Sequence, residues 1–196
     1  MTVPTGRRER KKAATRQKIA DAAMRLFMER GYEAVGIREV AAEADVAVTT
    51  LFAHFPSKEA LVFARDEDFE ERLARAVTER APGAPLLPPL RAEVHALVRH
   101  CTAESAVPVW SMINASPALR KYEESMRVRH AERLAAAVAA DPEASRTATA
   151  SRALAQFVVD AYALAREAAD PEGAVDEVFR MIEAAWEVTA PREPAA

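Results

Sequence analysis

Apolar residues recur at intervals of three and four along most of this chain, and this spacing constrains the fold more than any other feature. Ile19, Ala23, Leu26 and Phe27 follow the pattern i, i+4, i+7, i+8, which places them on one face of a helix. Alanine, the best helix former, supplies 45 of the 196 residues, whereas only 5 are glycine. We therefore predict an all-α fold and exclude sandwiches, barrels and nucleotide-binding folds built on glycine-rich loops.

Four helices are predicted in the first 80 residues. Gly31 is suited to end the first of them, and Pro56 closes the third, because a residue before proline avoids the helical region. Gly36 is placed to cap the second helix, and Ser57 caps the fourth. The predicted helices span residues 14–30, 37–44, 48–55 and 57–80.

A proline-rich segment separates these helices from the rest of the chain. Residues 81–90 hold four of the twelve prolines and predict a linker or a sharp reorientation, so we place the domain boundary within 65–85. Asp141–Pro142 and Asp170–Pro171 have the residue types of a helix start, an N-cap followed by proline. Further helical patterns lie near 90–102, 104–114, 117–140, 144–168 and 171–189.

The net charge of −3 conceals an uneven distribution. Residues 1–65 contain 12 Lys and Arg against 8 Asp and Glu, whereas residues 66–196 contain 15 against 22. Seven basic residues and one acid fall within residues 1–18, and we interpret residues 1–13 as a flexible basic arm. A basic N-terminal region followed by an acidic remainder favours an anionic partner at the N-terminal region. A solvated tail that only adds solubility would have the same composition.

Several classes of protein are disfavoured. No apolar run approaches the roughly 18 residues of a membrane span, and residues 1–18 do not form a secretory signal. The single cysteine, Cys101, cannot form an internal disulfide, which fits a reducing cytoplasm. No catalytic motif or zinc-ligand spacing is present, so we expect no catalytic residues, no metal and no cofactor. The histidines considered as ligands are His54, His95, His100 and His130.

Three short helices within about 45 residues, two of them joined by a tight turn, are typical of a helix-turn-helix. On the later helix of that pair, Val48, Leu51 and Phe55 form an apolar face suited to burial. Thr49, Thr50 and Ala53 then point outward, and threonine can contact base edges through its hydroxyl or its methyl group. This arrangement predicts a DNA-recognition helix.

Residues 14–61 resemble the TetR family of bacterial transcriptional repressors. The resemblance rests on T-R-x-x-I-x-x-A-A-x-x-L-F-x-x-x-G-Y at 15–32, I-R-E-V-A at 37–41 and T-L-F-x-H-F-x-S-K-E-x-L at 50–61. It implies a helix-turn-helix from Ile37 to Pro56, with base contacts from its second helix and backbone contacts nearby. The DNA-binding residues so implied are Arg38, Val48, Thr49, Thr50, Phe52, Ala53, His54 and Lys58.

The chain departs from the family pattern at four positions. Asp45 stands where the family usually has glycine, so Asp45 is expected to adopt a left-handed conformation. Ala47 cannot cap the recognition helix, and Gly36 replaces a capping hydroxyl residue. Phe52 stands in place of tyrosine and lacks the hydroxyl that would bond a phosphate.

The resemblance further implies a helical C-terminal domain that binds a ligand and forms a homodimer. We assign residues 14–74 to DNA binding, 75–189 to this second domain and 190–196 to a tail. Large apolar side chains near its middle are candidates for the ligand pocket: Phe69, Leu97, Cys101, Trp110, Met112, Ile113, Tyr122, Met126 and Phe157. Apolar stripes on the last two helices predict the dimer interface: Tyr162, Ala165, Val178, Phe179, Ile182 and Trp186.

Together these expectations describe a cytoplasmic, homodimeric repressor that a small apolar ligand releases from a palindromic operator. Two alternatives stay open. The chain could be a helical interaction module whose basic arm binds an acidic partner, or a regulator that senses redox state through Cys101.

Overall fold

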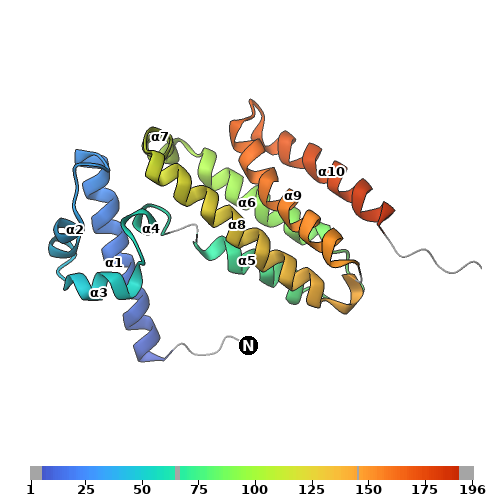
Figure 1. Cartoon of the computed structure of the whole chain (residues 1–196), viewed down its shortest axis with the longest axis horizontal. Coiled ribbons are helices and arrows are strands. Elements are labelled where there is room, and N and C mark those ends of the chain that lie inside the picture. Colours follow the sequence, from blue (N-terminus) through green and yellow to red (C-terminus); the bar gives the residue numbers. More distant parts are fainter. Residues whose placement is uncertain (1–5, 65–66, 145, 190–196) are drawn as a thin grey trace, which may run out of the picture. The chain divides into compact units, whose positions relative to one another are not determined.

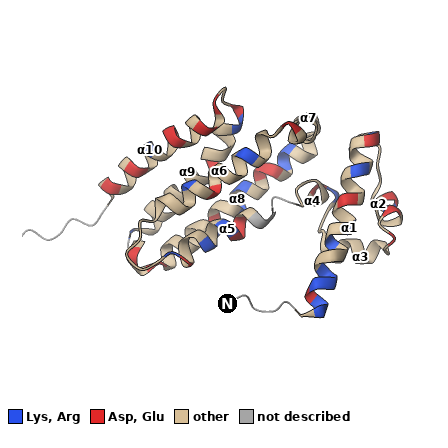
Figure 2. Ribbon diagram, turned by 180° about the vertical axis from the view of Figure 1, so that it is seen from behind, with Lys and Arg blue, Asp and Glu red and all other residues tan. Residues whose placement is uncertain are grey.

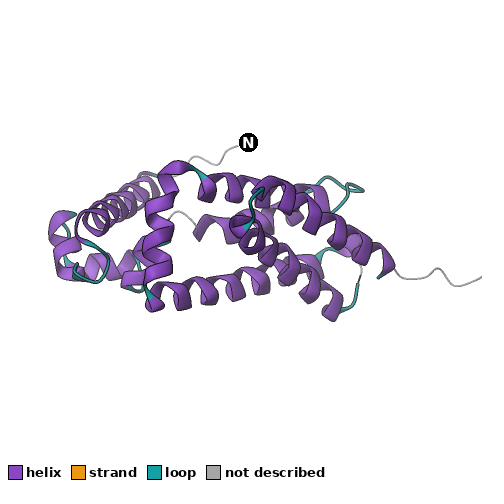
Figure 3. Ribbon diagram, turned by 90° about the horizontal axis from the view of Figure 1, so that it is seen from above, coloured by secondary structure: helices purple, strands orange, loops and turns teal. Residues whose placement is uncertain are grey.

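The computed structural model describes residues 6–64, 67–144 and 146–189, and every regular element in these ranges is a helix (Figures 1 and 3). The predicted all-α fold is thus confirmed. None of the helices described is both long and apolar enough to cross a membrane. The elements are α1 (Arg7–Arg30), α2 (Ile37–Glu43), α3 (Val48–His54), α4 (Lys58–Val62), α5 (Glu67–Thr78), α6 (Leu87–Thr102), η1 (Glu104–Ala106), α7 (Val107–Ala115), α8 (Pro117–Ala140), η2 (Pro142–Ala144), α9 (Ala148–Glu167) and α10 (Pro171–Val188).

The chain divides into two compact units. Unit 1 comprises residues 1–65 and 108–122, and unit 2 comprises residues 66–107 and 123–196. Each unit has its own buried core, and the chain passes between the units after residues 65, 107 and 122, the last of which lies in α8.

Unit 1 is built around α1, which packs against α2 and α4, while α2 packs against α3. Its core is formed by side chains that are at most 1% exposed: Ile19, Phe27, Val40, Leu51, Phe55 and Leu61. The C-terminal segment of the unit joins this core through Phe63, whose ring stacks on Tyr122 at a centroid distance of 5.5 Å. Ser116 adds a hydrogen bond of 2.9 Å to Glu33. Residues distant in the sequence thus complete the unit that holds α3.

The predicted helix ends in unit 1 are largely confirmed. Gly31 has a φ of 83° and donates its N–H to the carbonyl of Phe27 at 2.9 Å, which ends α1. The Ser57 hydroxyl accepts a hydrogen bond from the amide of Ala60 at 3.3 Å and so caps α4. At Gly36, which has no capping side chain, the carboxylate of Glu39 accepts the backbone N–H at 2.7 Å.

The prediction of a flexible arm is wrong for residues 7–13, which are the first two turns of α1. Arg, Lys, Glu and Ala all favour helix, and neither glycine nor proline interrupts the chain between Arg7 and Arg30. The charge of this segment therefore lies on a helix surface.

The single helix predicted from Ser57 to Arg80 is also wrong, because α4 ends at Val62 and α5 begins at Glu67. The four consecutive residues 60–63 are all buried, whereas a longer amphipathic helix would turn some of them to solvent. No proline or glycine marks this break in the sequence. The proline-rich segment 81–90 likewise ends inside a helix, because Pro88 occupies the first turn of α6.

In unit 2, α9 packs against α6 and α10, and α5 packs against α6. The core includes Leu90, Val94 and Phe179, none of which is exposed. Asp170 caps α10 as predicted, since its carboxylate accepts the N–H of Gly173 at 3.1 Å. Asp141–Pro142 opens only the short helix η2, because Thr147 provides the cap of α9 by accepting the N–H of Ala150 at 3.2 Å.

The buried histidine of unit 2 predicts a pH-dependent stability. His130 is 7% exposed with its ring edge against Phe69, and burial together with Arg129 lowers its pKa to about 4. The unfolded imidazole titrates near 6.5, so protonation favours unfolding as the pH falls from about 6.5 to 4. The loss is about 3 kcal/mol of unfolding free energy.

Urea unfolding at pH 7.5 and pH 4.5 measures this loss. The His130→Leu variant should lose less stability over the same interval than the natural chain, because only the other groups titrate. Equal losses in the two proteins would show that His130 does not control this pH dependence.

Candidate nucleic-acid interface

The second helix of the predicted helix-turn-helix, α3, has a buried face and an exposed face. Leu51 is completely buried, as is Phe55 directly after the helix end. Thr49, Phe52 and Ala53 are exposed, and Phe52 is 49% exposed despite its size. The other predicted contacts on this helix, Val48, Thr50 and His54, are half-buried, and Arg38 is exposed on α2. The structure therefore gathers most of the predicted DNA-binding side chains on the accessible surface of α2 and α3.

The turn between α2 and α3 is tight and depends on Asp45. Asp45 has a φ of 48°, which confirms the left-handed conformation expected at this family glycine position. The amide of Val46 then bonds to the carbonyl of Ala41 at 2.9 Å, a contact that closes the end of α2. As expected, Ala47 precedes α3 without any capping hydrogen bond from its side chain.

Arg16 ties the C-terminal end of α3 to α1. Its Nη1 donates to the carbonyl oxygen of His54 at 2.7 Å, and its guanidinium lies 4.1 Å from the centroid of the Phe55 ring. A cation at the carbonyl end of a helix is favourable, and the ring adds a cation–π contact. The sequence analysis did not single out Arg16, although Arg16 belongs to the motif at 15–32.

His54 is poorly suited to carry a positive charge toward DNA. Burial, followed by the charges of Arg16 and Lys12, lowers the pKa of its imidazole. The ring is thus neutral at neutral pH, and a contact from His54 to a phosphate would be an uncharged hydrogen bond.

Lys58 is turned toward the protein. Its Nζ donates to the carbonyl of Tyr32 at 2.6 Å and lies 4.0 Å from the centroid of the Tyr32 ring. The Tyr32 hydroxyl in turn donates to Glu59 at 3.1 Å, and burial together with the Glu59 charge raises the pKa of Tyr32. This cluster joins α4 to the segment that follows α1, so Lys58 holds unit 1 together whether or not it also meets a phosphate.

Replacing Lys58 by methionine should therefore lower the stability of unit 1 by about 1.5–3 kcal/mol, the usual contribution of a hydrogen bond from a charged group. Thermal unfolding followed by circular dichroism measures this change. We expect the salt dependence of DNA binding to change little. A fall of about 1 in the salt slope with unchanged unfolding would instead assign Lys58 to phosphate contact.

Basic residues gather on the first turns of α1 (Figure 2). Arg7, Arg8, Arg10, Lys11 and Lys12 are all exposed. Because they follow one another on a helix, their charges are presented by a rigid element, which suits contact with a polyanion.

The nine predicted pocket residues do not form one group within either unit. Four belong to unit 1, namely Trp110, Met112, Ile113 and Tyr122, and five belong to unit 2. Within unit 2, Phe69, Leu97, Cys101 and Met126 are buried, whereas Phe157 is 54% exposed. Phe157 is thus largely exposed although its neighbours Val158 and Ala161 on α9 are buried, so the structure does not place it in the interior of unit 2.

Four of the six predicted dimer residues serve the core of unit 2. Tyr162, Ala165, Phe179 and Ile182 are at most 7% exposed, and Val178 and Trp186 are half-buried. The large apolar side chains of α9 and α10 that remain exposed are spaced seven residues apart on each helix, and we call them the outer stripe. The outer stripe consists of Phe157 and Leu164 on α9 and Met181 and Val188 on α10, which are 54%, 60%, 67% and 85% exposed. Most of the side chains predicted for a dimer interface are thus buried within a single chain, and the exposed apolar side chains of α9 and α10 are other ones.

Part of the sequence matches known proteins. A family model described as "Bacterial regulatory proteins, tetR family" matches residues 19–64. The repressor KstR of Mycolicibacterium smegmatis is 48% identical over 67 residues, which cover 34% of this chain and 32% of KstR. KstR of Mycobacterium tuberculosis is 44% identical over 70 residues, covering 35% and 32% of the two chains. The matched segment thus spans about a third of the length of these relatives.

Solved structures are similar over nearly the whole chain. GusR of Salmonella enterica covers 89% of this chain, which in turn covers 96% of GusR, with a TM-score of 0.57 and 21% identity. The TetR family repressor AlkX of a Dietzia species has a TM-score of 0.59 at 18% identity, with 89% and 98% covered. A complex of SmeT with triclosan has a TM-score of 0.58 at 20% identity, with 93% and 99% covered. At these identities the likeness establishes a shared fold.

Proposed function

The chain belongs to the TetR family of bacterial regulatory proteins, and on that premise we propose that it is a transcriptional repressor that binds a palindromic operator as a homodimer. The observation that carries the proposal is the division of α3 into a buried face, formed by Leu51, and an accessible face that presents Thr49 and Ala53. Short side chains on the accessible face allow the helix to enter the major groove closely enough to contact base edges.

The charge of unit 1 supports the same proposal. The exposed basic side chains on the first turns of α1, together with Arg38 on α2, supply the positive charge that phosphate contacts require. Such contacts position a protein on DNA and make its affinity dependent on salt.

The outer stripe supports a homodimer. A row of exposed apolar side chains along two neighbouring helices is costly in water and is suited to meet the same row on a second copy. A two-fold dimer presents two copies of α3, which a palindromic operator can bind in successive major grooves about 34 Å apart.

We further propose that a small apolar ligand releases the repressor from DNA. Solved relatives of the same fold include SmeT with triclosan and FadR of Thermus thermophilus with lauroyl-CoA. In this chain the predicted pocket residues that are buried in unit 2, such as Phe69 and Met126, are the candidates for ligand contact. A ligand that binds the DNA-free form 100-fold better shifts the equilibrium by about 2.7 kcal/mol.

DNase footprinting on the DNA around the gene for this protein tests the proposal. The expected result is a protected palindrome whose two half-sites lie about one helical turn apart. Protection without any symmetric sequence, or no protection above that given by unrelated DNA, would contradict it.

A further inference from the structure

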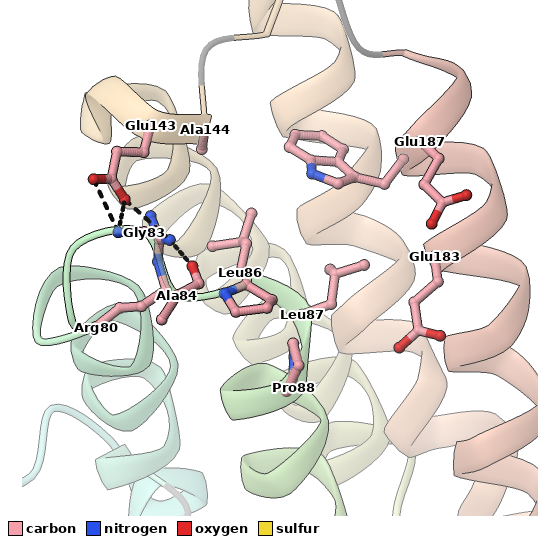
Figure 4. Close-up of a pocket in the computed structure, with 12 residues that line it drawn as sticks. Arg80, Gly83, Ala84, Leu86, Leu87, Pro88, Glu143, Ala144, Glu183 and Glu187 are labelled. Atoms are coloured by element: carbon pink, nitrogen blue, oxygen red, sulfur yellow. Dashed lines mark hydrogen bonds and ion pairs between the residues drawn. The ribbon is translucent and has the colours of Figure 1, made fainter.

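Unit 2 contains a cavity of about 610 Å³ that belongs neither to the proposed DNA surface nor to the predicted pocket (Figure 4). Its walls come from Arg80 and the segment 83–88 before and at the start of α6, from η2, and from the last turns of α10. We call it the Trp186 cavity. Its volume lies in the usual range of small-molecule sites, roughly 300–1,000 Å³.

One part of the wall is apolar and aromatic. Leu86 and Leu87 line the cavity from the α6 side, and the half-buried Trp186 lines it from α10. The guanidinium of Arg146 lies 5.0 Å from the centroid of the Trp186 ring. The protein itself therefore places a cation against this ring, as cation–π attraction favours.

The other part of the wall is acidic. Glu183 and Glu187 follow each other by one turn of α10, and Glu143 lies on η2 (Figure 4). Glu183 has a weak ion pair with Arg91 at 3.8 Å, both side chains being more than a third exposed. Glu187 has no side-chain ion pair among the residues described. These two carboxylates are available to a positively charged group in the cavity.

Among the described residues that line the cavity, Arg80 is the basic one, and its charge is already neutralised. Arg80 is 8% exposed and forms ion pairs with Asp141 and Glu143, and it also donates to the carbonyl of Ala84. Glu143 further accepts the N–H of Gly83 at 2.9 Å. Arg80 thus stabilises the loop before α6, and its charge is not available to bind an anion in the cavity.

A metal ion does not fit this site. The described residues include no group of three or more His, Cys, Asp or Glu side chains arranged to hold a metal. Carboxylates beside a tryptophan ring and leucine side chains suit a cation that has an apolar body. We propose that the Trp186 cavity binds an amphiphilic organic cation, with its charge near Glu183 and Glu187 and its apolar body against Trp186, Leu86 and Leu87.

This site and the outer stripe use different faces of α10. Trp186 is five residues from Met181, which corresponds to a rotation of about 140° around the helix. A cation in the cavity and a second copy on the outer stripe can therefore be bound at the same time. The proposal goes beyond DNA binding and does not depend on it.

Tetraphenylphosphonium and tetraphenylborate, which have nearly the same shape and opposite charges, provide the test. The full-length chain is titrated with each ion by isothermal calorimetry, and quenching of Trp186 fluorescence is followed in a Trp110→Phe variant, since the chain has two tryptophans. We expect the phosphonium to bind at least tenfold more tightly than the borate. The double variant Glu183→Gln, Glu187→Gln should weaken phosphonium binding at least tenfold, and Trp186→Leu should weaken it as well.

The matched control replaces two exposed glutamates elsewhere in unit 2, Glu132→Gln and Glu177→Gln, and should leave phosphonium binding unchanged. Equal affinity for the two ions, or equal effects of the two double variants, would overturn the proposal. A variant in which α3 is disrupted, such as Ala53→Pro, should still bind the phosphonium. The test of this cation site is therefore independent of the test of the proposed repressor function.

Discussion

Replacing Ala53 by proline is expected to reduce operator affinity at least 100-fold. A proline at this position removes the hydrogen bond from residue 53 to the carbonyl of Thr49 and clashes with that carbonyl, at a cost of about 3 kcal/mol. Helix α3 has only seven residues and cannot absorb this cost. Because Ala53 is exposed, the substitution removes no side chain from the core of unit 1. Fluorescence anisotropy with the footprinted operator measures the loss.

A matched control is Ala148→Pro, another exposed alanine, at the first position of α9. Thr147 before it is extended, with φ of −66° and ψ of 152°, so proline is tolerated there and operator binding should be retained. The alternative in which the basic turns of α1 bind an acidic partner predicts a different pattern. Binding would then survive Ala53→Pro and be lost in Arg8→Gln, Lys11→Gln, Lys12→Gln. That outcome would exclude recognition by α3.

Placing charges in the outer stripe is expected to produce a folded monomer that binds the operator at least 100-fold more weakly. The variant is the double substitution Leu164→Glu, Met181→Glu. Because Leu164 and Met181 are each at least 60% exposed in a single chain, these substitutions should preserve the fold of unit 2. In a two-fold dimer, four added carboxylates would be brought together and desolvated, which is strongly unfavourable. Sedimentation velocity gives the oligomeric state, and anisotropy gives the affinity.

Val128→Glu serves as the control for this variant, because Val128 is 50% exposed on α8 and lies outside the stripe. It should remain a dimer with full operator affinity. A dimer that persists in Leu164→Glu, Met181→Glu would show that the copies associate through another surface.

The helix-turn-helix could be predicted closely from the sequence because its signals are local. The left-handed Asp45, the cap at Ser57 and the glycine that ends α1 each depend on residues within one helical turn of each other. The packing of Leu51 and Phe55 follows from helical periodicity alone. These features need no knowledge of distant contacts.

The remaining features depend on tertiary contacts that leave little trace in the sequence. The end of α4 at Val62 is set by burial of four successive side chains, and Lys58 reaches a carbonyl 26 residues away. On α9, Phe157 and Tyr162 are both large and apolar, and only their positions against α6 and α10 decide that one is exposed and the other buried. The Trp186 cavity is built from three segments that lie more than 35 residues apart in the sequence, so no single motif could indicate it.

The contact between Arg16 and the carbonyl of His54 has a mechanical consequence. Since α3 is fastened to α1 at this point, and Lys58 fastens α4 to the segment after α1, the recognition helix cannot tilt independently of its neighbours. If the proposed effector weakens DNA binding, we expect α1, α3 and α4 to move together. Substitutions at Thr49 or Ala53 are then expected to change which operator sequence is preferred, without changing how the DNA-binding helices move when DNA is released.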